Sequence, residues 1–119
     1  MYARETEPVG STERGRLPDD ARVETAVVAL RMLADPTRLR LMWTLRDGEF
    51  DVGSLATAVG AARPAVSQHL AKLLLAGLVS SRRDGRRALY RARGGHVRRL
   101  VTEVILAAEH RVTGAAEHD

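Results

Sequence analysis

The stretch Asp51–Arg93, DVGSLATAVGAARPAVSQHLAKLLLAGLVSSRRDGRRALYRAR, decides the fold. It predicts a short helix over Ser54–Val59 and a turn over Gly60–Ala62. A second helix is expected to begin on Pro64 and to end near Ala76, because proline suits the first position of a helix. This order of helix, turn and helix is typical of modules that read DNA.

A basic hairpin follows these helices. Val79–Arg91 contains an Asp-Gly pair between two segments of strand character, which favours a tight turn at Asp84-Gly85. Helix, turn, helix and basic hairpin in succession predict a winged helix-turn-helix with a double-stranded DNA partner. The fold class we expect is mainly α with a small β-hairpin, in a dimeric winged helix-turn-helix.

The second helix of this stretch has two distinct faces at 100° per residue. Apolar side chains fall on one face and are expected to pack on the preceding helices; they are Val66, Leu70, Leu73 and Leu74. The other face carries small and hydrogen-bonding side chains, of which Gln68 can pair with adenine through two hydrogen bonds. The DNA-binding residues predicted on this helix are Arg63, Ser67, Gln68, His69 and Lys72. An ordinary solvated helix face is the alternative.

Basic residues concentrate in the same region. Ten of them lie between Arg63 and Arg99, where Asp84 is the only acid, although the net charge of the chain is only +4. Such segregation indicates a polyanionic partner. We expect four hairpin arginines to contact phosphates and the minor groove, namely Arg82, Arg83, Arg86 and Arg87.

The remaining helices are placed by their start signals. Pro18-Asp19-Asp20 opens a helix, and Asp35 is expected to cap the next one, which begins on Pro36. The core side of that helix is assigned to Leu39, Met42, Trp43 and Leu45. Phe50–Val52 is expected to be extended, with Ser54 as the cap of the following helix. The last helix is expected over His96–His110.

The 119 residues provide for one domain. We expect a disordered tail over 1–17, a DNA-binding and dimerisation domain over 18–111 and a flexible tail over 112–119. No cysteine is present, which excludes disulfides and thiolate metal sites. No apolar run is long enough to span a membrane, and the first residues form no signal core, so a cytoplasmic protein is expected. No set of residues indicates an enzyme.

Three segments together resemble the ArsR/SmtB family of dimeric winged-helix regulators, most of which respond to metals. They are Leu33–Leu41 (LADPTRLRL), Val66–Leu73 (VSQHLAKL) and Arg83–Arg86 (RDGR). The family's cysteine site is missing, and its common zinc pattern on the last helix is broken by Gly94 and Ala107. The histidine arrangement is instead similar to KmtR/NmtR-type nickel and cobalt sensors. The resemblance implies a nickel or cobalt ion, with zinc also compatible, bound by His96, Glu109, His110 and His118.

Helix geometry limits how such an ion could be held. His96 and His110 are 14 residues apart, which is about 21 Å along a helix, so one ion cannot join them within one chain. Antiparallel pairing of two last helices would bring His96 of one copy to Glu109 and His110 of the other. The dimer contact is assigned to Val97, Leu100, Val101, Val104 and Ala108.

Two alternatives stay open. The chain could be a DNA-binding regulator with no metal effector, controlled by a protein co-regulator. It could also use its winged helix as a docking surface for another protein.

Overall fold

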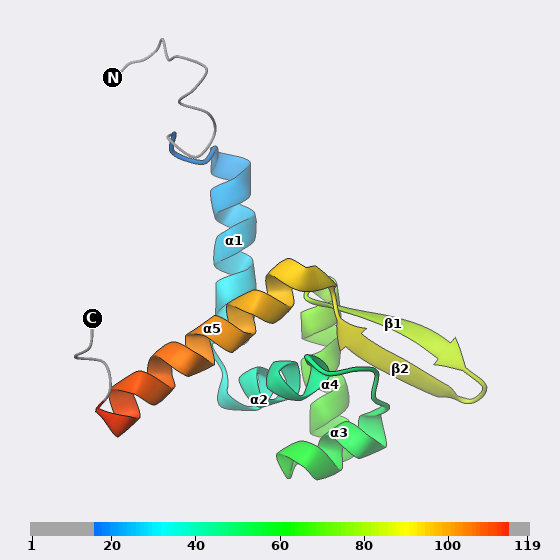
Figure 1. Ribbon diagram of the computed structural model, residues 1–119. Helices are drawn as coiled ribbons and strands as arrows, with labels where there is room; N and C mark the ends of the chain where they lie inside the picture. Colours follow the sequence, from blue (N-terminus) through cyan, green and yellow to red (C-terminus); the bar gives the residue numbers. More distant parts are fainter. Residues whose placement is uncertain (1–15, 115–119) are drawn as a thin grey trace.

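The computed structural model describes residues 16–114, over which the chain forms five helices and one antiparallel hairpin arranged as a winged helix-turn-helix (Figure 1). The elements are α1 (Asp20–Leu33), α2 (Pro36–Leu45), α3 (Val52–Val59), α4 (Arg63–Leu75), β1 (Val79–Asp84), β2 (Arg87–Ala92) and α5 (Gly94–Thr113). The expectations for residues 1–15 and 115–119, including His118, lie outside the described residues. Within residues 16–114, no helix has the length and apolar character needed to cross a membrane.

Aspartates set the starts of the first three helices. Asp19 accepts a hydrogen bond from the backbone N–H of Arg22, and Asp35 from that of Arg38, each at 2.9 Å. These contacts confirm both predicted starts. The cap of α3 is Asp51, whose Oδ1 accepts from Ser54 N at 2.7 Å. The prediction that Ser54 caps α3 was therefore wrong. Asp51, three residues earlier, accepts the backbone N–H of Ser54, so Ser54 lies inside the first turn of the helix.

This earlier cap changes the segment before α3. The helix begins at Val52, two residues before the predicted start, so the extended segment is reduced to Phe50 and Asp51. The backbone of Phe50 pairs with that of Tyr90 on the open edge of β2, with N–O distances of 3.0 and 2.9 Å. Phe50 thus attaches the hairpin to the chain between α2 and α3.

Other boundaries differ by one to three residues. Asp84 pairs with Arg87, so the hairpin turn is Gly85-Arg86, with Gly85 in the left-handed region at φ 67°. The predicted turn at Asp84-Gly85 was one residue early, because Asp84 still takes part in the ladder. Helix α5 begins at Gly94 and continues through Thr113, so the expected domain end at residue 111 falls inside it.

The core lies where α2, α3 and α4 meet the base of the hairpin and α5. Its fully buried large side chains are Leu41, Met42, Leu45, Leu55, Val66, Leu70, Leu73, Val79 and Val101. Leu41 takes the central position that we expected of Leu39 and Trp43, which are partly buried. Leu74, at 41% exposure, was wrongly assigned to the buried face, because α4 buries a narrower stripe than predicted.

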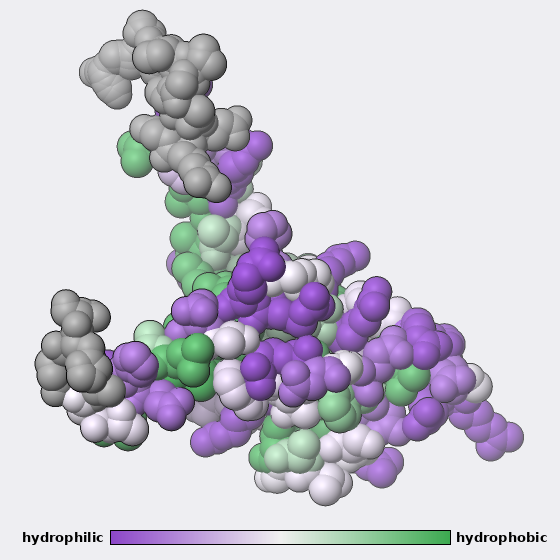
Figure 2. All heavy atoms as spheres, viewed as in Figure 1, coloured by the Kyte–Doolittle hydropathy of each residue, from purple (hydrophilic) through white to green (hydrophobic). Residues whose placement is uncertain are grey.

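Helices α1 and α5 extend beyond this core. Figure 1 shows α1 standing away from the body, and in Figure 2 hydrophobic side chains lie open along it. Its exposed apolar residues are Val23, Val27, Val28 and Leu30. Helix α5 is held on α2 by Arg46, which lies 3.4 Å over the Trp43 ring and donates to Thr102 Oγ1 at 3.5 Å.

We predict that Leu70→Ala lowers the free energy of unfolding by about 2–5 kcal/mol, because it opens a cavity in the packed core. Leu75→Ala in the same helix is the matched control, since Leu75 is 91% exposed, and should change stability by less than about 0.5 kcal/mol. Chemical denaturation measures both. Equal losses for the two variants would contradict the described core.

Candidate functional site

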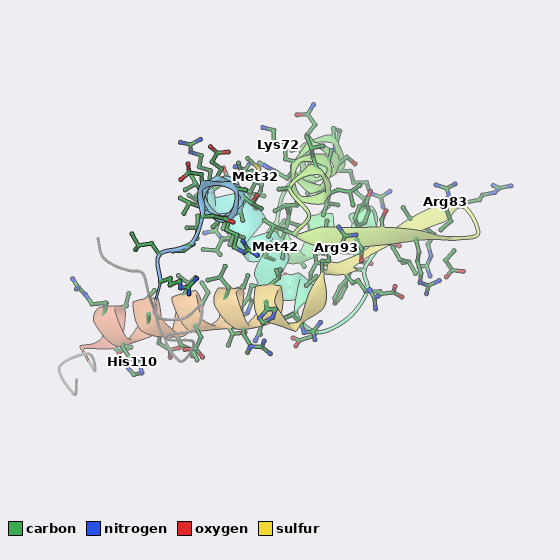
Figure 3. All side chains as sticks on the ribbon, turned by 90° about the horizontal axis from the view of Figure 1, so that it is seen from above. Met32, Met42, Lys72, Arg83, Arg93 and His110 are labelled. Atoms are coloured by element: carbon green, nitrogen blue, oxygen red, sulfur yellow. The ribbon has the colours of Figure 1, made fainter. Side chains whose placement is uncertain are left out.

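The outer face of α4 is built from side chains that can form hydrogen bonds. Burial of Val66, Leu70 and Leu73 turns the opposite side of the helix to solvent. Lys72 is exposed, and Figure 3 shows it on the side of α4 nearest α1. Four of the five predicted DNA-binding residues of this helix are exposed, namely Arg63, Ser67, Gln68 and Lys72. Their exposure meets the first requirement for contact with a groove of DNA.

The amino-terminal end of α4 is also open. The N-cap is Ala62, and no side chain of the described residues caps the first turn, which contains no acid. The first N–H groups of the helix therefore remain available to an anion such as a phosphate. Arg63 crosses from here to α3, where a Cβ on Gly53 would lie 2.6 Å from its Nη2. Gly53 leaves the space in which this guanidinium lies.

His69 differs from its neighbours on α4. It is only partly exposed, and its Nδ1 lies 3.2 Å from Nη1 of Arg38. Arg38 is buried and also donates from Nε to the carbonyl of Met32 at 2.6 Å. One side of the His69 ring is thus engaged within the protein, which limits any DNA contact to the other side.

The hairpin arginines fall into two pairs. Arg82 forms a bidentate ion pair with Glu49, with both N–O distances at 2.8 Å. Arg87 reaches Asp51 at 3.2 Å and Asp84 at 3.3 Å. Together with the Phe50–Tyr90 bridge, these pairs tie the hairpin to the segment before α3.

Arg83 and Arg86 form the other pair. They lie at the end of the hairpin, where Figure 3 shows the Arg83 side chain extending away from the body. Neither has an ion-pair or hydrogen-bond partner through its side chain within residues 16–114. Of the four predicted contacts, Arg83 and Arg86 can meet a phosphate without breaking an existing pair, whereas Arg82 and Arg87 must first leave a carboxylate.

Ion pairs and caps also set the protonation of three carboxylates. The side-chain hydrogen bond from Arg82 lowers the pKa of Glu49. The backbone N–H of Ser54 is the largest cause that lowers the pKa of Asp51, and the N–H of Arg38 acts likewise on the pKa of Asp35. The lowered pKa values keep all three carboxylates ionised at neutral pH. The contacts of Glu49 and Asp51 at the base of the hairpin, and the Asp35 cap of α2, therefore persist there.

The metal-ligating candidates that are described lie on α5. His96, Glu109 and His110 are all exposed, and the helix is continuous between them. In Figure 3, His110 points away from the body. Over residues 16–114, no three histidine, cysteine or acidic side chains of one chain come together as a metal site. The structure therefore keeps His96 apart from Glu109 and His110, as helix geometry requires.

His96 has one further neighbour. Nη2 of Arg99 lies 3.0 Å from its Nδ1. A metal on Nδ1 would replace this contact, and a metal on Nε2 would leave a proton on Nδ1 that faces the guanidinium donor. Metal binding at His96 therefore requires Arg99 to move in either case.

The predicted dimer residues of α5 are not equivalent. Leu100, Val104 and Ala108 are exposed, with 39% and 47% for the first two. Val101 is fully buried within its own chain and Val97 packs against that core. Val101 was wrongly assigned to a dimer contact, because a side chain with no exposed surface adds no area to an interface.

Sequence reasoning missed Arg38 and the carboxylates that anchor the hairpin. Arg38 precedes Leu41, Met42 and Leu45 by three, four and seven residues, so it shares their buried face. That spacing was a usable signal of a buried arginine. Glu49 carried no comparable signal, because its partner Arg82 is 33 residues away in the chain.

The architecture and this site agree with known proteins. The profile of the family described as "Bacterial regulatory protein, arsR family" matches residues 35–81. KmtR, an HTH-type transcriptional regulator of Mycobacterium tuberculosis, is 49% identical over 102 residues, covering 86% of this chain and 78% of KmtR. The chain belongs to the ArsR family of bacterial regulatory proteins. NmtR of the same organism is 36% identical over 110 residues, covering 92% of each chain.

Solved structures lead to the same family. The homodimeric winged helix-turn-helix DNA-binding domain of a possible ArsR-family regulator from Mycobacterium bovis superposes with a TM-score of 0.73 at 33% identity. The match covers 80% of this chain and 91% of that domain. Family membership makes the protein a transcriptional regulator and not an enzyme.

We predict that the free energy of unfolding of the regulator falls as the pH drops below about 5. A carboxyl group whose pKa is lowered by folding stabilises the protein above its unfolded pKa, near 3.8 for Asp51, and this stabilisation is lost as pH falls through the folded value. Asp51→Asn should be less stable than the parent at neutral pH, and the two should converge in acid. A difference that is constant over this range would contradict the role given to Asp51.

We also predict unequal salt effects among the hairpin arginines. Arg83→Ala and Arg86→Ala should each reduce the slope of log affinity against log salt by about one for a random-sequence duplex. Arg82→Ala is the matched variant, and it should leave that slope nearly unchanged because Arg82 is bound to Glu49. Fluorescence anisotropy measures the slopes. An equal loss for Arg82→Ala would show that its ion pair opens on DNA.

Proposed function

We propose that this regulator is a homodimer that binds a palindromic operator, and that nickel or cobalt held between two α5 helices changes its affinity for DNA. The main observation behind the proposal is the exposed face of α4, whose side chains can form hydrogen bonds and which belongs to the same module as the hairpin. The end of the hairpin bears Arg83 and Arg86, which are unpaired within the described residues. A DNA partner also supports the expectation that the protein acts in the cytoplasm.

Each part of the DNA surface has a distinct role in this proposal. The amino-terminal half of α4 enters the major groove, where Ser67 and Gln68 contact base edges. Lys72, Arg83 and Arg86 contact phosphates, which positions the protein without specifying sequence. Two copies related by a twofold axis would read half-sites one helical turn, about 34 Å, apart.

The homodimer is supported by apolar surface without a partner in one chain. Exposed side chains line both α1 and α5, including Val27, Leu30, Leu100 and Val104. Burial of such surface is the main driving force of stable association. The similar domain from Mycobacterium bovis is described as homodimeric, which supports the same state here.

The metal proposal rests on the donors of α5 and their separation. Imidazole and carboxylate donors without sulfur suit nickel or cobalt, and zinc is compatible. Because about 21 Å separates His96 from His110 along α5, the ion would join His96 of one copy to Glu109 and His110 of the other. His118, outside the described residues, would complete the set. Similarity to KmtR and NmtR supports this assignment.

Metal and DNA would then be coupled through the dimer. A cation bound between the two α5 helices favours the arrangement of subunits in which its ligands meet. DNA favours the arrangement in which both α4 helices fit successive major grooves. If the arrangements differ, each ligand changes the affinity for the other by the same factor, typically 1–3 kcal/mol of coupling free energy.

We predict that nickel or cobalt binds the parent dimer and changes its affinity for operator DNA by about five- to 150-fold. Isothermal titration with nickel, cobalt and zinc, followed by anisotropy of a labelled operator with and without metal, measures both effects. His96→Ala/His110→Ala should lose the heat and the coupling and keep basal DNA binding. Glu24→Ala, on α1, is the control and should keep both.

Absence of heat in the parent protein would contradict the metal site while leaving DNA binding in place. The regulator would then be controlled by a protein co-regulator or by no effector. Loss of binding to all duplexes would contradict the DNA surface itself.

A further inference from the structure

Among residues 16–114, Arg38 is the one polar or charged residue that is buried, with 9% of its surface exposed. Its interactions join three helices. Its Nε donates to the carbonyl of Met32 in the last turn of α1 at 2.6 Å, and its backbone N–H donates to the cap Asp35 at 2.9 Å. Its Nη1 lies 3.2 Å from Nδ1 of His69 on α4.

The chemistry of the guanidinium fixes the role of the His69 ring. Arginine has five N–H donors and no acceptor, so Nδ1 of His69 must accept this hydrogen bond. An accepting Nδ1 carries no proton, which places the ring proton on Nε2. The side of the ring that faces away from Arg38 is therefore a hydrogen-bond donor.

The position of His69 makes this donor useful. At 100° per residue it lies between the buried stripe of α4 and the exposed side that carries Lys72, one turn further along. The residue is half-buried, so part of it reaches the surface while its Nδ1 is engaged by Arg38. Phosphate oxygens are acceptors, and a neutral N–H donor in a fixed orientation fits them.

We propose that Arg38 is a positioning residue that holds His69 as an Nε2–H donor to the DNA backbone, and so links the end of α1 to the DNA-reading helix. The DNA part rests on the proposed function, whereas the state of the ring can be measured in the free protein. A purely structural bond between α2 and α4 would stabilise the fold without any effect of His69 on DNA.

The ring state is tested by nitrogen-15 NMR of the histidine side chains near neutral pH. The neutral His69 ring of the parent should be the Nε2–H tautomer, with the Nδ1 resonance shifted by a hydrogen bond. Arg38→Lys should shift His69 toward a mixture of tautomers, because one ammonium cannot reach both Met32 and His69. Arg40→Lys, on the exposed side of α2, is the matched control and should leave the ring unchanged.

A His69 ring in the parent that carries its proton on Nδ1, or on both nitrogens, would overturn the proposal. A ring signal identical in the parent and in Arg38→Lys would also overturn it. Because the control changes an arginine of the same helix, a general disturbance of α2 would be recognised in it.

DNA binding tests the second half of the proposal. His69→Ala should weaken binding to a random-sequence duplex about three- to tenfold, the range of one hydrogen bond. The salt slope should stay unchanged because no charge is removed, unlike Arg86→Ala, which should lower it by about one. Arg38→Lys/His69→Ala should bind no more weakly than His69→Ala, since Arg38 acts through His69.

Additive losses in the double variant, or full affinity in His69→Ala, would overturn the DNA contact. His69→Ala leaves Arg38 bound to Met32, so a folded variant is expected, and thermal denaturation checks it. If even the parent fails to bind any duplex, the proposed function fails with the DNA contact, and the NMR result still decides the positioning of His69.

Discussion

The structure depends on the burial of one narrow stripe of α4 against α2 and α3. Val66, Leu70 and Leu73 have no exposed surface, and they fix the rotation of α4 about its axis. Since α4 is continuous, this rotation also decides which side chains face outward, so packing and the choice of the DNA-reading face are the same constraint. Because protein interiors are closely packed, a rotation of α4 would force these buried side chains out of their places in the core.

The hairpin is held to the same core by polar contacts. Glu49 and Asp51 bind two of its arginines, and Phe50 between them pairs with β2. The three residues thus act as one anchor that keeps the hairpin in place before DNA arrives. Surface ion pairs are weak singly, so the anchor depends on their combination with the backbone bridge. The unpaired Arg83 and Arg86 are presented at its end.

Local signals in the sequence predicted the elements better than the contacts between them. Asp35 with Pro36, and the Asp-Gly pair near the hairpin turn, act within four residues, so the helix start and the hairpin were recognised. The cap of α3 and the width of the buried stripe of α4 depended on competition between neighbours. Pairs such as Arg82 with Glu49 join distant parts of the chain, and periodicity does not reveal them. The buried Arg38 was visible in the helical pattern and was missed.

Because α5 is one continuous helix that keeps His96 and His110 apart, the central claim for regulation is that two chains share one cation. The most direct measurement mixes His96→Ala chains with His110→Ala chains and counts the metal bound by the purified heterodimer. At one of the two metal sites between the α5 helices, the intact His96 of one chain then meets the intact His110 of the other. At the second site the two alanines meet. The account predicts one nickel or cobalt ion per heterodimer and none in either variant homodimer. A heterodimer that binds no metal while the parent binds two ions would contradict it.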